Sequence, residues 1–172
     1  FLLKNRRHTP YLDLDLDVLP ALNEDLHTLA GLTDGVVTAG NDCRILQDGA
    51  LFPAMEADIA AARHCIHLET FVWTAGALER RFVDLLSRKA REGVKVRLLI
   101  DAMGSVGGDD KNLECVAEAG AELSIYCKPH WWNLRRFNHR THRKLLIVDG
   151  VVGYTFGHGI ADQWLGNGGV EK

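Results

Sequence analysis

The sequence contains no apolar run of about 18 residues or more, and its first residues lack the pattern of a secretory signal. No membrane-spanning helix is therefore expected within the 172 residues. Its four cysteines include no C-x-x-C pair, which argues against both a zinc site and a disulfide framework. Buried free thiols are expected instead, and these favour a reducing compartment.

A strong excess of charge is also absent, because the net charge is −3. This balance argues against a generally basic nucleic-acid-binding protein. With 47% hydrophobic and 25% charged residues, the composition is that of a soluble globular domain and disfavours disordered, collagen-like and coiled-coil classes. The distribution of charge is uneven, since residues 128–144 hold six Lys or Arg and no Asp or Glu. Anions are expected to be drawn to this stretch.

One part of that region has a spacing that suits phosphoryl chemistry, the pattern H-x-K-x4-D formed by His142, Lys144 and Asp149. Two runs rich in β-formers, residues 145–148 and 151–156, flank an Asp-Gly pair, and this order predicts a β-hairpin with a two-residue turn. Because side chains alternate along a strand, His142 and Lys144 are expected to project from the same side. The imidazole can then attack phosphorus while the ammonium neutralises phosphoryl oxygens.

Hydrophobic periodicity predicts alternating helices and strands before the motif. The predicted helices cover residues 21–29, 51–63, 78–92 and 109–119, and the predicted strands cover residues 36–39, 43–46, 65–73, 94–100 and 121–127. Strand, helix, strand series imply parallel strands joined by right-handed crossovers. The predicted fold class is α/β, with a mixed, largely parallel sheet flanked by helices.

Ligands of such sheets bind beyond the carboxyl ends of the strands, which draws attention to two acidic residues. Glu69 stands in a largely apolar strand, where a lone carboxylate is more often a structural hydrogen-bonding group than a catalyst. Asp101 ends the next predicted strand and opens a Gly-rich loop, which a plain flexible connection explains equally well. Both are treated as candidate substrate-binding residues, and Glu69 as a secondary one.

Together these features resemble the phospholipase D superfamily and, within it, the bacterial cardiolipin synthase-like branch. The resemblance covers about three quarters of the chain, from about Asn41 onward. It rests on Asn138, Arg140, His142, Arg143, Lys144, Asp149, Gly150, Gly157 and residues 160–164, and on the earlier stretches 67–73 and 97–105. The expected organisation is an N-terminal lead-in over residues 1–35 and a phospholipase D-like domain with one catalytic motif over residues 36–172.

The resemblance implies phosphodiester transfer or hydrolysis on phospholipids through a phosphohistidine intermediate. His142, Lys144 and Asp149 are the implied catalytic residues, and neither a metal nor another cofactor is implied. Glu69 and Asp101 are joined as substrate-binding candidates by Asn138, Arg140 and Gly157. The expected substrate is a phospholipid at a membrane surface, and nucleic acid is less favoured. The expected location is the cytoplasm or the periphery of the cytoplasmic membrane, with an upstream anchor left open.

Active sites of this superfamily use two such motifs, and this sequence contains one. Either two copies form a homodimer, or the chain is the N-terminal half of a longer two-motif enzyme. The absence of an initial Met and the ending soon after the motif favour the second interpretation. The sequence also departs from the usual pattern, with Phe156 where a glycine is usual and Gly159 where an asparagine is usual. His158, between them, is either a surface residue or a local proton carrier, and the first interpretation is favoured.

Two alternative functions follow from these features. A homodimeric endonuclease of the same superfamily is favoured by the single motif and by the aromatic residues Trp131, Trp132 and Phe137 within the basic stretch. A catalytically weak domain that binds phospholipid or nucleic acid is favoured by Phe156 and Gly159, which alter the expected phosphate site.

Overall fold

The computed structural model describes residues 23–36, 40–105, 110–127 and 140–165. By its contacts the chain divides into two units, Phe1–Ile45 and Leu46–Lys172, and each is described by itself. The first unit contains helix α1 (Asn23–Thr33), which confirms the helix predicted there with later bounds. The predicted domain boundary after residue 35 stays a prediction.

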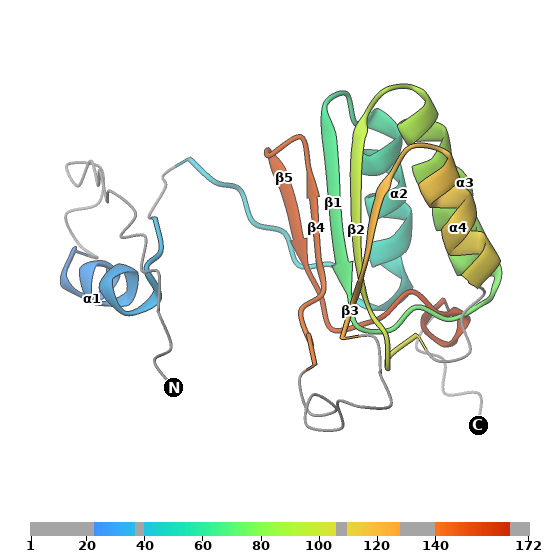
Figure 1. Ribbon diagram of the computed structural model, residues 1–172. Helices are drawn as coiled ribbons and strands as arrows, with labels where there is room; N and C mark the ends of the chain where they lie inside the picture. The colour runs from blue at the N-terminus through green and yellow to red at the C-terminus, as the bar shows by residue number, and fades with distance from the viewer. Residues whose placement is uncertain (1–22, 37–39, 106–109, 128–139, 166–172) are drawn as a thin grey trace, which may run out of the picture. The chain divides into compact units, whose positions relative to one another are not determined.

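The second unit is built on a five-stranded sheet with the order β3-β2-β1-β4-β5 (Figure 1). Its strands are β1 (Cys65–Thr70), β2 (Lys95–Asp101), β3 (Glu122–Tyr126), β4 (Leu145–Val148) and β5 (Val152–Thr155). Strands β1, β2 and β3 pair in parallel, while β4 pairs antiparallel with both β1 and β5. Four of the five strands therefore run in one direction, and the predicted mixed, mostly parallel sheet is confirmed.

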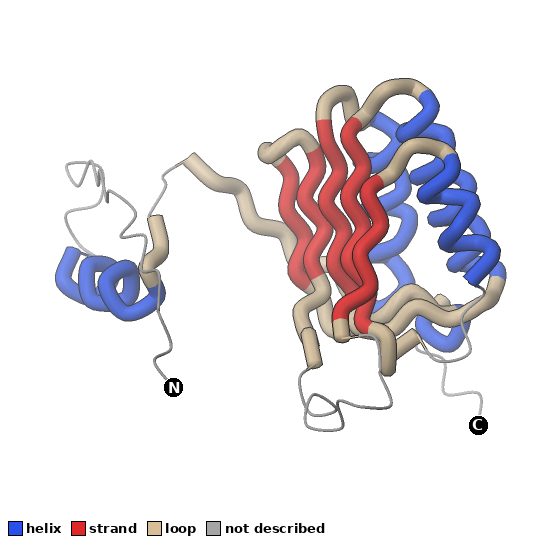
Figure 2. Tube along the Cα trace, in the orientation of Figure 1, coloured by secondary structure: helices blue, strands red, loops and turns tan. Residues whose placement is uncertain are grey.

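Three helices cover one face of this sheet, namely α2 (Leu51–Ala61), α3 (Ala77–Arg91) and α4 (Asp110–Glu118) (Figure 2). The alternation along β1 explains which face they cover, because Ile66, Leu68 and Thr70 are buried while the residues between them are only half-buried. In α3 the apolar residues form a buried stripe, with Phe82 and Leu86 fully enclosed. Packing of these apolar faces holds the helices on the sheet.

The hairpin between β4 and β5 forms, but its connection is one residue longer than predicted, because Val148 pairs with Val152 and residues 149–151 lie between the strands. Asp149 and Gly150 both have positive φ, +53° and +69°, and the N–H of Val151 donates to the carbonyl of Val148 at 3.0 Å. Positive φ at both central residues is the requirement of a type I′ turn, which follows the twist of paired strands. The Asp-Gly pair therefore forms the turn, and Val151 is the additional residue before the paired part of β5.

The strand predicted over residues 43–46 is wrong. These residues form irregular backbone, and Ile45 is 88% exposed, so the run lacks the neighbouring strand that would give its apolar residues a surface to cover. Most of the strand predicted over residues 36–39 lies outside the described residues. None of the described helices is both long enough and apolar enough to cross a membrane.

The chain after β5 returns to the segment that follows β1. The N–H of Ile160 donates to the carbonyl of Val72 at 2.9 Å, and its carbonyl accepts from Thr74 at 3.0 Å. Asp162 then accepts 2.8 Å hydrogen bonds from the N–H groups of Leu78 and Ala77 at the start of α3. These bonds lower the pKa of the Asp162 carboxyl, and the bond from Leu78 has the largest effect. A carboxylate at this end of a helix satisfies its free N–H groups and complements its dipole.

Candidate active site

His142 and Lys144 meet over one aromatic ring just beyond the carboxyl end of β1. The imidazole of His142 stacks on Phe71 with ring centroids 4.4 Å apart and an interplanar angle of 15°. The ammonium of Lys144 lies 5.9 Å from the centroid of the same ring and donates to the carbonyl of His142 at 3.0 Å. The candidate nucleophile, His142, and the candidate cation, Lys144, are thus neighbours on the ring of Phe71.

The residue before His142 is held by acids from two adjacent strands. The N–H of Thr141 donates to Asp101 Oδ2 at 2.9 Å, and its hydroxyl donates to Glu69 Oε1. The other oxygen of Asp101 accepts from the N–H groups of Met103 at 2.9 Å and Gly104 at 3.4 Å. Asp101 is fully buried, so its carboxylate is occupied in organising the loop and Thr141.

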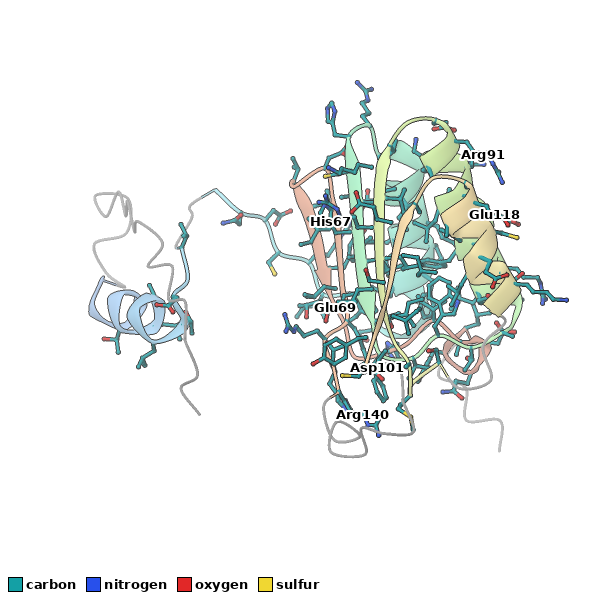
Figure 3. The ribbon with its side chains drawn as sticks, viewed as in Figure 1. His67, Glu69, Arg91, Asp101, Glu118 and Arg140 are labelled. Atoms are coloured by element: carbon teal, nitrogen blue, oxygen red, sulfur yellow. The ribbon has the colours of Figure 1, made fainter. Side chains whose placement is uncertain are left out.

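A pocket of about 170 Å³ opens beside these groups. It is lined by Glu69, Leu99, Tyr126, Arg140, Thr141, His142 and Arg143. The side chain of Arg143 is largely exposed, and its Nε lies 3.8 Å from Glu69 Oε1. Figure 3 shows Glu69, Asp101 and Arg140 toward the same end of the sheet, with His67 nearer the start of β1. Two guanidinium groups and an imidazole therefore border a space with the polarity that a phosphate group needs.

Asp149, the third residue of the motif, lies at the opposite end of β1 from His142. Its carboxylate accepts 2.8 Å hydrogen bonds from the N–H groups of Arg63, His64 and Cys65, where β1 begins. The backbone bond from Cys65, followed by that from Arg63, lowers the pKa of Asp149 to about 2. A carboxylate in this position ties the β4–β5 turn to the start of β1 and does not face the pocket.

The remaining candidates differ in position. Asn138 lies outside the described residues. Gly157 is exposed, and a Cβ added there would meet no atom within 4 Å. Phe156 packs partly buried against the core, and its N–H donates to the carbonyl of Lys144 at 3.3 Å.

The two departures next to Gly157 have structural explanations. A Cβ added at Gly159 would overlap the side chain of Val72 and lie 2.8 Å from a Trp164 ring atom, so an asparagine would not fit here without movement. His158 is half-buried, with its ring centroid 6.5 Å from that of Phe52 and 6.0 Å from that of Trp164. His158 therefore packs more closely than the surface interpretation implies, because the chain after β5 folds back over α2.

The cysteines are less buried than predicted. All four are free thiols, but Cys43 and Cys115 are exposed, while Cys65 and Cys127 are half-buried. Both exposed thiols stand outside the strand and helix faces that build the core. Among the described residues no group of three or more His, Cys, Asp or Glu side chains is arranged to hold a metal ion.

Two residues that complete the site carried no assigned role from the sequence, Phe71 and Thr141. The alternation along β1 does place Phe71 on the same face as Glu69, but it does not show that the imidazole of His142 stacks on its ring. That contact depends on the pairing of β4 with β1, in which Leu145 faces Glu69. For Thr141, the only indication in the sequence of a role at the site is its position directly before His142.

Two solved structures share the fold of this sheet and its helices. Nuc from Salmonella typhimurium, titled a phospholipase D family member, is 21% identical with a TM-score of 0.50, over 64% of each chain. NucT from Helicobacter pylori is 13% identical with a TM-score of 0.52, over 67% of this chain and 70% of NucT.

Residues 55–162 match the family described as "Cardiolipin synthase, PLD-like domain", and the chain belongs to this family. The major cardiolipin synthase ClsA of Bacillus subtilis is 36% identical over 148 residues, which are 84% of this chain and 30% of that protein. Cardiolipin synthase A of Pseudomonas entomophila is 35% identical over 74% of this chain and 27% of that protein. The chain thus spans less than a third of the length of these bacterial relatives.

Proposed function

We propose that this chain carries one half of a phosphodiester-transfer site that acts on phospholipids, as in a cardiolipin synthase or phospholipase D. The observation that carries the proposal is the placement of His142 and Lys144 over Phe71, beside a pocket bordered by Arg140 and Arg143. Identity of about 35% to proteins named cardiolipin synthases supports phospholipid as the substrate class. Hydrolysis and transfer share the first chemical step and differ only in the acceptor.

In the first step an imidazole nitrogen of His142 attacks the phosphorus of the phosphodiester. The bond from phosphorus to the leaving alcohol breaks, and a second histidine, from another motif, donates a proton to the departing oxygen. Lys144 lies close enough to His142 to neutralise the non-bridging oxygens as charge develops on them.

In the second step an alcohol or a water molecule replaces the imidazole on phosphorus. The second histidine, now neutral, removes the proton of the acceptor, and His142 is released. Transfer to an alcohol requires that water be excluded from the intermediate, whereas hydrolysis does not. The proposed site therefore needs a second motif, in another copy of the chain or in another part of the protein.

The other candidates receive different proposed roles. Arg140 lines the pocket, and we propose that it contacts the phosphate together with Arg143. The burial of Asp101 and the contacts of Asp149 support positioning roles for both residues. Substrate contacts by Asn138 and Gly157 stay predictions. A lipid substrate also implies that the site works at a membrane surface, to which the exposed Arg143 would present its charge.

The test is to incubate an assembly that supplies a second motif, either a dimeric fraction of this chain or a longer protein that contains it, with phosphatidylglycerol vesicles, and to follow both glycerol release and a phosphatidyl adduct by peptide mass spectrometry. The adduct is expected on His142, and His142→Ala should remove it and reduce any turnover by at least about 10³-fold. His64→Ala changes an exposed histidine at the other end of β1 and should leave both signals unchanged.

An adduct that persists in His142→Ala would overturn the assignment of the nucleophile. Salt-sensitive cleavage of single-stranded DNA, without any reaction on vesicles, would instead support the endonuclease alternative. Binding of vesicles by such a two-motif assembly, with no adduct, would support the inert binding domain.

A further inference from the structure

We propose that Thr141 is the positioning residue of the nucleophile, which it holds against Phe71 through its contacts with Glu69 and Asp101. The inference rests on the proposed function, because it assigns how His142 is oriented for that reaction. Its structural part, the orientation itself, can be measured without any turnover.

Thr141 is fixed at two atoms by two different strands. Its N–H is bound by Asp101 at the end of β2, and its hydroxyl is bound by Glu69 near the end of β1. The side chain is buried, with 6% of the residue exposed, so water does not compete for these bonds. Hydrogen bonds to carboxylates are stronger than those between neutral groups, and here one acts on the backbone and the other on the side chain.

The support beneath His142 is held by the same loop. A Cβ added at Gly104 would overlap the carbonyl group of Phe71, so the loop after β2 packs directly on the backbone of Phe71. That loop is closed on itself, because Ser105 Oγ donates to the carbonyl of Asp101 at 2.5 Å and the N–H of Met103 donates to its carboxylate. One hydrogen-bonded turn thus carries the anchor of Thr141 and contacts Phe71, on which His142 stacks.

This arrangement differs from the hydrogen bond that commonly orients a catalytic histidine. An imidazole is commonly held by a hydrogen bond to a carboxylate or a carbonyl group. The described residues provide no such bond to His142; they provide a stacking face on one side and a fixed backbone just before it. Without the Thr141 hydroxyl the backbone at residue 141 keeps one anchor and can rotate about it. The imidazole would then leave the Phe71 face for part of the time.

The experiment compares Thr141→Val with Thr141→Ser by proton NMR of the histidine side chains in the full chain. Stacking on Phe71 shifts the ring protons of His142 upfield, and Phe71→Leu defines the unstacked value. We expect Thr141→Val to move the His142 signals toward that value, and Thr141→Ser, which keeps the hydroxyl, to retain the original shift. Thr155→Val makes the same change at an exposed threonine of β5 and should leave the spectrum of His142 unaltered.

Formation of the phosphatidyl adduct supplies the second measurement. Thr141→Val is expected to slow it by about 10²-fold with little change in the vesicle concentration at half-maximal rate, and Thr141→Ser to restore it. Unaltered His142 signals in a folded Thr141→Val protein would overturn the positioning role. If Thr141→Val does not fold, Glu69→Ala removes the same bond and is judged by the same criterion. Altered signals with no adduct in an unmodified assembly that contains a second motif would leave the positioning role standing and remove the proposed function instead.

Discussion

Three backbone N–H groups converge on the carboxylate of Asp149, and they account for its low pKa. The folded state stabilises the charged form of the Asp149 carboxyl more than the unfolded chain does, because those three donors are aligned only when β4 lies beside β1. The ordinary pKa is 3.8 and the folded value is about 2. A group of this kind contributes stability above pH 3.8, and the contribution is lost as the pH falls through about 2.

Asp149→Asn is therefore expected to lower the free energy of unfolding at neutral pH. The difference from the unmodified protein should be constant above pH 3.8 and should shrink between pH 3.8 and about 2, where Asp149 itself becomes protonated. Urea unfolding across this range measures it. Asp84→Asn, an exposed change on α3, provides the baseline. A difference that stays constant down to pH 2 would show that the charge of Asp149 is not involved.

At the scale of elements, the segment that follows β5 determines how the end of β1 is enclosed. Ile160 pairs with Val72 and Thr74, and Asp162 binds the start of α3. The approach between Gly159 and Val72 is close enough that only a glycine fits without displacement. The Cβ that an asparagine would need at this position would lie 2.4 Å from Val72 Cβ and 2.8 Å from the carbonyl oxygen of Val72.

Gly159→Ala is expected to reduce the free energy of unfolding by about 1–3 kcal/mol, because the added methyl group must displace Val72 or Trp164. Gly157→Ala, two residues earlier at an open position, is the matched control and should change it by less than about 0.5 kcal/mol. Chemical denaturation of both variants makes the comparison. Equal effects would mean that the chain after β5 is not packed against Val72 as described.

At the scale of the whole molecule, the single motif supplies one nucleophile, His142. The proposed reaction also needs a second histidine, from another motif, to protonate the leaving alcohol. A monomeric chain is therefore expected to give no multiple turnover on phosphatidylglycerol vesicles, whereas an assembly that contains a second motif is expected to turn over. Light scattering on the same fractions used for the assay measures the mass of the particle. Sustained turnover by a species with the mass of one 172-residue chain would contradict the two-histidine mechanism.

The sequence by itself determined those features that depend on neighbours along the chain. The stripe of α3, the alternation of β1 and the Asp-Gly turn predicted their elements because helix and strand periods and turn chemistry are local. The spacing of His142 and Lys144 likewise indicated that they would stand together. The failure over residues 43–46 has the same origin, since a strand also needs a partner and local pattern does not supply one.

Only the tertiary structure decided what surrounds His142. The pairing of β4 with β1 places Phe71 under the imidazole, and the pairing of β1 with β2 brings Glu69 and Asp101 to the two sides of Thr141. The same pairings carry Asp149 to the start of β1, away from the residues with which it shares a motif. Adjacent residues of a motif can be separated by the length of a strand, and distant ones can meet, because strand register sets distances that spacing along the chain does not fix.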